Sequence, residues 1–423
     1  MRTMRVALVT AGEPLPTDRH DIRLHRTGQF ASWLATNGHE VDWVTNQFDH
    51  FQKKHRSANG TISVAENYRI HLLESRGYER NLSLRRFLDH ADLGNSFRAI
   101  EHRLGRPDVV LAAMPTIELA NEAVRFAHAV GAASVVDIRD LWPDIMIERA
   151  PAGVRWLARL ALSSLTRLLG SAMRGADGII SQNQAFVDWG LSHAKRTATP
   201  LDATIPLGYE FRPLAEAERS NAIAFWKSRG LDLAGSRSPM LAYAGSLSTG
   251  ADFSAVLTAG DQLRSRSVRV VICGVGEQLE SLQRAAETRD HILLPGWCSY
   301  AQLRVLLESA TVGLIPYRDS VNFANALPNK AGEYLAHGLP LAWSLGTGPL
   351  DRYIAENGVG CSYHKSAEVL TKYVEHLLDN PTVLVATQAA ARRLFEREFQ
   401  ADTVHQRLLD HLTLATKRHA AAA

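Results

Sequence analysis

Short apolar runs, each followed by a loop and then by an amphipathic segment, recur along the whole chain. Residues 6–10 have the composition of a buried strand, and the breaker-rich loop 11–14 follows them. Apolar residues with helical spacing fill 27–37, and a second strand is expected at 40–45. A strand, a loop, a helix and another strand in this order open a parallel sheet with helices on its faces. We therefore predict an α/β fold.

The same alternation continues in both halves of the chain. Further strands are expected at 68–73, 109–113, 133–137, 178–181, 239–244, 267–273, 291–294, 312–316 and 339–344. A polar, helix-prone segment at 214–235 separates the two series, and 423 residues exceed what one hydrophobic core usually holds. We predict two Rossmann-like domains facing across a cleft, 1–212 and 213–423, and the last helix could pack back on the first domain.

Charge and cysteine content exclude several classes of protein. The formal net charge of +3 is too small to favour nucleic acid as a partner. Cys273, Cys298 and Cys361 lack the paired spacing of metal sites or disulfide frameworks, which favours a reducing cytoplasm. The chain starts without a signal-peptide pattern, and no apolar run approaches the roughly 20 residues that cross a bilayer. We expect a cytoplasmic protein whose membrane contact, if any, is peripheral.

The stretch 325–340, NALPNKAGEYLAHGLP, predicts a short helix with a chemically mixed face. Pro328 suits a first helical turn and Gly338 ends the helix. Lys330 in the first turn opposes the helix dipole, which an anion such as a diphosphate would offset. Glu333, one turn later, offers two oxygens to the hydroxyls of a ribose. The alternative is an ordinary i,i+3 ion pair between Lys330 and Glu333 on a solvated face.

This stretch resembles the donor-binding element of the family-four retaining glycosyltransferases, in which seven residues separate two glutamates. Glu333 matches the second glutamate, and Asn325 occupies the position of the first. The sequences Pro-Asn-Lys and Glu-Tyr-Leu-Ala resemble the envelope-polysaccharide branch of that family. The resemblance implies the two-domain GT-B fold, retention at the anomeric carbon and a nucleoside-diphosphate sugar, UDP-linked, as donor. It assigns donor binding to Asn325, Ala326, Leu327, Lys330 and Glu333, and catalysis also to the last two.

Further landmarks of the family follow in family order in the second half. Gly245 and Ser246 resemble the glycine loop whose backbone amides approach the donor phosphates. The Gly-x-Gly sequence at 274–276 is a weak signal, to which we give a structural role. Gly296 and Trp297 resemble the segment that borders the nucleotide base, on which Trp297 could stack. Partial burial of Trp297 between sheet and helix is the alternative.

In the first half, 135–144 places charged groups beyond the carboxyl end of a strand, where doubly wound folds bind ligands. The segment resembles the Asp-Leu-Trp-Pro element of the branch, with Arg139 in place of the histidine that faces the sugar in other members. The resemblance implies catalytic roles for Arg139 and Asp140. Asp140 is the expected contact to acceptor or transferred sugar, with Asp144 as a further one, and loop capping is the alternative for Asp140. Arg23 and Arg26 resemble the loop that contacts phosphate, and a solvated basic turn is their alternative.

Residues 151–174 combine four arginines with tryptophan and leucines and contain no acidic residue. Such an amphipathic basic segment can rest on an anionic membrane leaflet. The alternative is a helix that packs on its own domain and exposes its arginines.

Taken together, these features predict a glycosyltransferase of the hexosyl or N-acetylhexosaminyl class that needs no cofactor. The chain contains no Asp-x-Asp sequence, so we expect no metal on the donor diphosphate. The branch resemblance implies a lipid-linked or cell-envelope saccharide as acceptor, at the inner face of the membrane. Two alternatives stay open: a nucleotide-sugar epimerase or isomerase of the same fold, and a non-catalytic sugar-nucleotide-binding partner. Asn325 and Arg139, which depart from the family pattern, favour the second.

Overall fold

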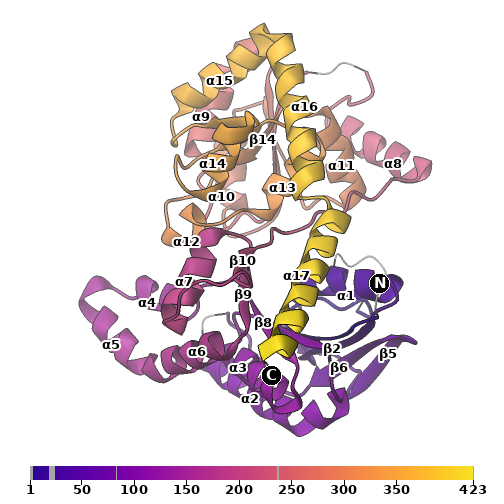
Figure 1. Cartoon of the computed structure of the whole chain (residues 1–423). Coiled ribbons are helices and arrows are strands. Elements are labelled where there is room, and N and C mark those ends of the chain that lie inside the picture. The colour runs from indigo at the N-terminus through magenta and orange to yellow at the C-terminus, as the bar shows by residue number, and fades with distance from the viewer. Residues whose placement is uncertain (1–2, 19–23, 82, 236–237, 423) are drawn as a thin grey trace. The chain divides into compact units, whose positions relative to one another are not determined.

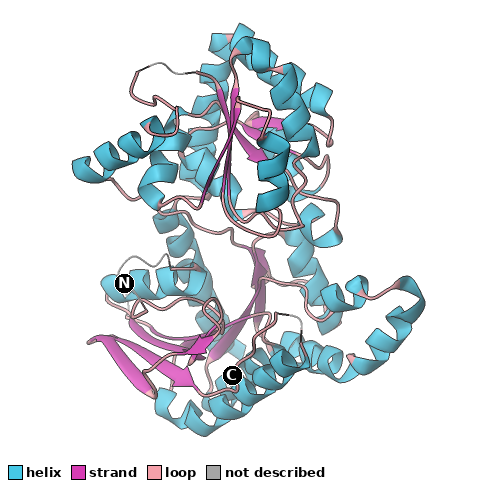
Figure 2. Cartoon of the chain, turned by 180° about the vertical axis from the view of Figure 1, so that it is seen from behind, coloured by secondary structure: helices cyan, strands magenta, loops and turns pink. Residues whose placement is uncertain are grey.

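The computed structural model describes residues 3–18, 24–81, 83–235 and 238–422. The chain forms two compact units, which we call unit 1 (1–206 and 405–423) and unit 2 (207–404). In each unit, helices cover both faces of a largely parallel sheet (Figure 2). This arrangement confirms the predicted α/β fold class.

Unit 1 contains an eight-stranded sheet in the order β10-β9-β8-β7-β1-β2-β6-β5. All neighbouring strands are parallel except β5, which runs antiparallel to β6 at the edge. The central strand β1 is buried and pairs with β2 and β7, so that Leu8 lies between Trp43 and Leu111. The strands are β1 Arg5–Val9, β2 Glu40–Asn46, β5 Thr61–Ala65, β6 Tyr68–Leu73, β7 Val109–Ala113, β8 Ala133–Ile138, β9 Gly178–Ser181 and β10 Ala203–Thr204. A small separate hairpin pairs β3 Phe48–Asp49 with β4 Lys54–His55.

Helices from both ends of the chain cover this sheet. They are α1 Arg26–Thr36, α2 Leu84–Ile100, α3 Ile117–Val130, α4 Asp144–Arg149, α5 Arg155–Ala161, α6 Ser163–Gly175, α7 Gln184–Ala194 and, after residue 404, most of α17 Ala401–Ala422. α17 lies beside α1 (Figure 1), where the ring of His405 is 5.7 Å from the rings of Phe30 and Trp33. The end of the chain therefore contributes to the core of the unit that the start of the chain builds.

Unit 2 contains a parallel six-stranded sheet in the order β13-β12-β11-β14-β15-β16. Its strands are β11 Met240–Ala244, β12 Arg269–Cys273, β13 Ile292–Gly296, β14 Val312–Ile315, β15 Leu341–Trp343 and β16 Gly360–Ser362. Its helices are α8 Glu216–Lys227, α9 Ser254–Gln262, α10 Leu279–Ala286, α11 Tyr300–Ser309, α12 Val321–Ala324, α13 Asn329–Ala336, α14 Gly348–Asn357, α15 Ala367–Asp379 and α16 Pro381–Glu398. The side chains of Trp226, Tyr334 and Trp343 are fully buried in its core.

Every strand expected from the sequence is present, with small shifts at its ends. The strands β3, β4, β5, β10 and β16 were not expected. β5 is largely exposed, and the other four are short, so none of them carries the apolar run that marks a central strand. Within the described residues, no helix combines the length and the apolar character needed to span a bilayer.

Four charged residues of unit 1 form what we call the buried charge cluster: Glu13, Arg26, Asp137 and Arg139. The fully buried carboxylate of Asp137 lies 2.9 Å from Nε of Arg26 and 2.9 Å from Nε of Arg139. Arg139 also contacts Glu13, whose carboxylate accepts a hydrogen bond of 3.1 Å from the backbone N–H of Thr27 at the start of α1. The cluster thereby joins the end of β8, the loop after β1 and the first turn of α1.

The carboxylates of this cluster oppose the effect of burial on the pKa of its two arginines. Burial lowers the pKa of Arg26, and the charge of Asp137 opposes that shift. For Arg139 burial acts in the same direction, but the carboxylates of Asp137 and Glu13 outweigh it and raise its pKa. Removing one member of such a set leaves another with an uncompensated charge away from water.

We expect Asp137→Asn to lower the free energy of unfolding of unit 1 by about 3 kcal/mol, because two guanidinium groups lose their shared carboxylate. Chemical denaturation measures this loss as a shift of the unfolding transition. Asp92→Asn is the matched control, since it removes a carboxylate from a more exposed ion pair with Arg76 in the same unit. Equal stability of the two variants would contradict the importance of the cluster.

Candidate functional site

In unit 2, the carboxyl ends of three adjacent strands are joined by backbone contacts. The N–H of Gly245 after β11 donates to the carbonyl of Cys273 at 3.0 Å, and the N–H of Gly274 after β12 donates to that of Gly296 at 2.8 Å. Gly274 has φ +148°, and a Cβ there would lie 1.8 Å from the carbonyl oxygen of Gly245. Only glycine permits this approach, which accords with the structural role expected for the Gly-x-Gly sequence.

Lys330 from the first turn of α13 lies over the glycine loop. Its Nζ donates to the hydroxyl of Tyr243 at 3.1 Å, and this hydroxyl donates to the carbonyl of Ser246 at 2.7 Å. The same Nζ is 4.2 Å from the ring centroid of Tyr243 and 4.9 Å from that of Tyr317. Burial lowers the pKa of Lys330 to about 7, although the charge of Glu333 opposes the shift. The structure therefore brings together the expected residues Gly245, Ser246 and Lys330.

The remainder of α13 is buried rather than solvated. Glu333 is 8% exposed, Tyr334 is fully buried and its hydroxyl accepts from the N–H of Ala244 at 2.9 Å. His337 is buried too, with Nδ1 2.8 Å from the carbonyl of Glu333, and burial lowers its pKa to about 4. The expected polar face thus lies within the protein, which contradicts the alternative of an ion pair on a solvated face. The N-cap position of α13 is Pro328, which makes no side-chain capping hydrogen bond.

The other expected donor residues differ in exposure. Leu327 is a buried member of the core of unit 2, whereas Asn325 and Ala326 before α13 are half-buried. Trp297, directly after β13, is 70% exposed. Its partial burial between sheet and helix, the alternative considered from the sequence, is therefore wrong. The indole is accessible to a ligand at the same sheet edge as the glycine loop.

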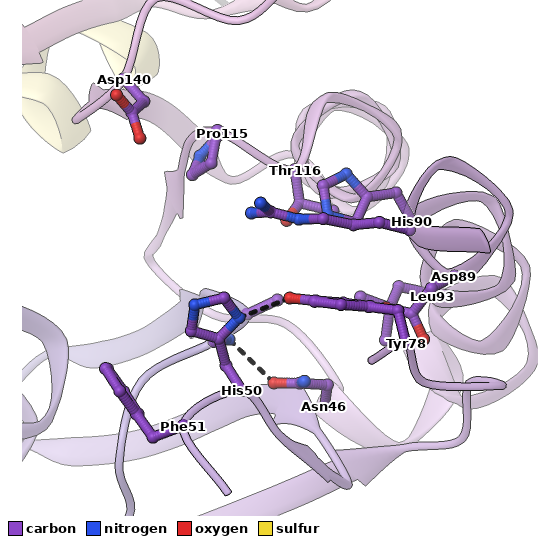
Figure 3. Close-up of a pocket in the computed structure, with 13 residues that line it drawn as sticks. Asn46, His50, Phe51, Tyr78, Asp89, His90, Leu93, Pro115, Thr116 and Asp140 are labelled. Atoms are coloured by element: carbon purple, nitrogen blue, oxygen red, sulfur yellow. Dashed lines mark hydrogen bonds between the residues drawn. The ribbon is translucent and has the colours of Figure 1, made fainter. Parts of the chain in front are cut away.

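Unit 1 contains a pocket of about 210 Å³ at the carboxyl edge of its sheet. Its walls come from the segments that follow β1, β2, β7 and β8 and from α2. The lining residues are Ala11, Gly12, Asn46, His50, Phe51, Tyr78, Arg86, Asp89, His90, Leu93, Pro115, Thr116 and Asp140. Asp140 and Pro115 lie on one side of this pocket, and Tyr78, Asp89 and His90 on the other (Figure 3).

Most of the polar groups in this pocket were missed by reasoning from the sequence. Nδ1 of His50 lies 2.5 Å from the hydroxyl of Tyr78 (Figure 3). Burial, assisted by the charge of Arg86, lowers the pKa of His50 to about 4 and that of His90 to about 3, so both rings are neutral near pH 7. The position of His50 beyond β2 was the one available signal, because ligands bind beyond strand ends in such sheets.

The remaining candidates of unit 1 are tied to other parts of that unit. Arg26 and Arg139 belong to the buried charge cluster, so neither forms the solvated turn considered for Arg26. Asp144 begins α4 and accepts from Nε1 of Trp189 at 2.8 Å, with Nε2 of His193 at 3.2 Å. Asp140 is half-buried at the pocket. Arg23 lies outside the described residues.

The segment 151–174 divides into an exposed and a packed part. α6 buries Leu169, Gly170, Ala172 and Met173, whereas α5 buries none of its residues. Packing on the domain therefore accounts for α6 and not for α5. In the ranges that the structure describes, no group of three His, Cys, Asp or Glu side chains is arranged to hold a metal ion.

Comparison with protein families assigns both halves of the chain to sugar transfer. Residues 25–198 match the glycosyl transferase 4-like domain, and residues 227–394 match the glycosyl transferases group 1. A search of curated proteins finds no match to the sequence.

Solved structures share the whole fold at low sequence identity. Sucrose-phosphate synthase from Thermosynechococcus elongatus has a TM-score of 0.70 at 15% identity, over 99% of each chain. HepE from Anabaena in complex with UDP has a TM-score of 0.66 at 11% identity, over 97% of this chain and 100% of HepE. WaaG, a glycosyltransferase involved in lipopolysaccharide biosynthesis, has a TM-score of 0.62 at 16% identity, over 96% and 99%. The chain therefore belongs to the group 1, 4-like glycosyltransferases of the GT-B fold, which transfer a sugar from a nucleotide-sugar donor.

Proposed function

We propose that the protein moves a hexosyl or N-acetylhexosaminyl group from a UDP-linked donor to a lipid-linked or cell-envelope saccharide, with retention and without a metal ion. The observation that carries the proposal is the position of Lys330 over the glycine loop, at the start of α13. A cation so poorly hydrated gains most from an anionic partner. The diphosphate of the donor is such a partner.

The position of Lys330 at the start of α13 also allows it to stabilise the negative charge that develops during sugar transfer. When the bond between sugar and diphosphate breaks, negative charge accumulates on the leaving phosphate. Lys330 and the start of α13 stabilise this charge without reorganising. The absence of Asp-x-Asp in the sequence is in keeping with catalysis that needs no metal on the diphosphate.

Two further residues support a nucleotide rather than a simple diphosphate. The exposed indole of Trp297 offers a flat surface to a base, and the carboxylate of Glu333 offers two acceptors to a ribose. Asn325 and Ala326, half-buried just before α13, complete the proposed donor site. UDP is favoured as the nucleotide because HepE, which has the same fold, binds UDP and UDP-glucose in its structures.

In unit 1, we assign the acceptor to the pocket that Asp140 lines. Asp140 is the carboxylate that meets the acceptor or the transferred sugar. Arg139 acts as a positioning residue, because its guanidinium is held by Asp137 and Glu13 and fixes the backbone next to Asp140. Arg26 and Asp144 stabilise this edge of the sheet. Arg26 contacts Asp137, and Asp144 accepts a hydrogen bond from Trp189 of α7.

We further propose that the protein works at the cytoplasmic face of a membrane, where a lipid-linked acceptor resides. Trp156 is 62% and Leu160 is 66% exposed on α5, and Arg155 and Arg159 are exposed on the same helix. Figure 1 shows α5 at the periphery of unit 1. Apolar side chains among arginines, with no acidic residue nearby in sequence, suit an anionic lipid surface.

The donor site predicts that UDP binds with an affinity that depends on Lys330. Because its pKa is about 7, Lys330 is charged below that pH, and UDP prefers the charged form. Affinity in calorimetry should therefore fall as pH rises from about 6 to about 8, and Lys330→Gln should weaken binding tenfold to hundredfold at the lower pH and remove this fall.

Two comparisons make this measurement specific. Lys372→Gln is the matched control, because Lys372 pairs with Glu368 on the exposed face of α15 and its replacement should not change UDP binding. Trp297→Ala should weaken UDP about tenfold through lost stacking and leave pyrophosphate unaffected. A Lys330→Gln variant that binds UDP like the unchanged protein would contradict the proposed donor site.

Turnover tests the reaction itself. In excess chelator, we expect slow release of UDP from UDP-hexoses without acceptor and faster release with an acceptor, because no metal takes part. NMR of the product should show the same anomeric configuration as the donor sugar. An inverted product, a new nucleotide sugar, or activity restored only by a divalent cation would each contradict part of the proposal.

Vesicle sedimentation tests the membrane contact. The protein should bind vesicles of phosphatidylglycerol and phosphatidylcholine and not phosphatidylcholine alone. Replacing Arg155 and Arg159 together by Gln should weaken binding roughly 30-fold, at about 1 kcal/mol per arginine. Replacing Leu84 and Leu88 by Ala is the control, because these leucines are exposed on α2 instead. Equal binding to both kinds of vesicle would contradict the proposal.

A further inference from the structure

The pocket of unit 1 contains an arginine that the proposed reaction has not yet used. Arg86 of α2 lines this pocket, with its guanidinium carbon 4.5 Å from the ring centroid of Trp142 and 5.3 Å from that of Tyr78. Its Nη1 donates to the backbone carbonyl of Asn81 at 3.0 Å, and its Nε donates to Nε2 of His90 at 3.4 Å. Two rings and two hydrogen bonds thus fix the direction of this guanidinium.

Among the residues that the structure describes, no carboxylate forms an ion pair with Arg86 within 4.0 Å, although Asp89 lines the same pocket. Lys53 is a second cation close to the pocket without being one of its lining residues. Its Nζ is 4.6 Å from the ring centroid of Tyr78 and donates a hydrogen bond of 2.6 Å to Oδ1 of Asn81. Lys53 and Arg86 therefore both lie near the ring of Tyr78. Because like charges repel, a bound anion would stabilise this pair of cations.

Two carboxylates, those of Asp89 and Asp140, also line this pocket. Asp89 is buried, and its Oδ1 accepts a hydrogen bond of 2.7 Å from the backbone N–H of Gly77. Asp140 lies on the side opposite Tyr78 and His90 (Figure 3). His90 is neutral near pH 7, and its Nε2 accepts the hydrogen bond from Nε of Arg86. Its ring therefore carries no charge that would attract or repel an anion. The pocket thus combines Arg86 and the hydrogen-bonded Asp89, both from α2, with Asp140 on the opposite side.

We propose that this pocket selects an acceptor saccharide that carries an anionic group, a phosphate ester or a carboxylate, and that Arg86 with Lys53 binds this group. The planar guanidinium suits either oxyanion because two N–H groups can meet two oxygens. Asp140 then faces the hydroxyl side of the sugar. The inference rests on the proposed function, since it names the class of acceptor for the same pocket.

Calorimetry with small sugars tests this selection. UDP binding is measured first, and the protein is then kept saturated with UDP so that phosphate probes cannot occupy the donor site. Glucose 1-phosphate represents a phosphate ester, glucuronate a carboxylate and glucose the neutral sugar. We expect one or both anionic sugars to bind at least tenfold more tightly than glucose, and the stronger of the two identifies the group.

Three variants locate the effect. Arg86→Gln should bring the affinity for the anionic sugar down to that for glucose, and Lys53→Gln should reduce it by a smaller factor. Arg106→Gln is the matched control, because Arg106 is exposed elsewhere in unit 1 and donates to the carbonyl of Val130. UDP affinity should be unchanged in all three, because the proposed donor site lies in unit 2, and a thermal unfolding transition like that of the unchanged protein shows that unit 1 of each variant is folded.

The inference is overturned if glucose binds as tightly as both anionic sugars, if no probe binds at millimolar concentration, or if neither Arg86→Gln nor Lys53→Gln alters the preference. Failure of UDP to bind is a separate result. It would contradict the proposed donor site in unit 2. The sugars would then be measured without UDP, and the preference of unit 1 would follow from comparing their affinities for Arg86→Gln and for the unchanged protein.

Discussion

The ion pairs of Asp137 with Arg26 and Arg139 are the constraint on which the ligand-binding edge of unit 1 depends. Asp137 is the penultimate residue of the buried strand β8. The guanidinium group of Arg26 reaches it from a segment distant in sequence, and that of Arg139 from the turn that follows the strand. Through Glu13, the same charges fix the loop after β1 and the first turn of α1. Because several loops share one set of charges, their positions are coupled, and the pocket beside them inherits that rigidity.

In unit 2, small residues rather than ion pairs allow the loops at the sheet edge to meet. Its loops meet because Gly274 leaves room for the carbonyl of Gly245, and the hydroxyl of Tyr243 connects that loop to Lys330. Glu333 is the carboxylate whose charge acts on Lys330, whereas Asp137 and Glu13 contact the arginines of the buried charge cluster directly. The buried charge cluster of unit 1 thus serves the structure, and the proposed function assigns Lys330 of unit 2 to a ligand.

The sequence allowed the central strands and the helix bearing Lys330 to be predicted, because both depend on local patterns of apolar residues, glycine and proline. It did not predict the burial of Tyr334 and His337, since helical periodicity alone does not say how much of a helix is covered. The roles of Arg26 and Arg139 were also hidden, because each partner of an ion pair comes from another segment. For the same reason the pocket with Arg86, Tyr78 and His90 became visible only in three dimensions.

The last helix, α17, gives the chain a particular order of assembly. Residues 405–423 belong to unit 1, although unit 2 lies between them and the rest of that unit in sequence. During synthesis, all residues of unit 2 therefore leave the ribosome before residues 405–423 of unit 1. Until then α1 lacks the neighbour that covers Phe30 and Trp33, so the nascent first unit exposes an apolar strip that a chaperone could recognise.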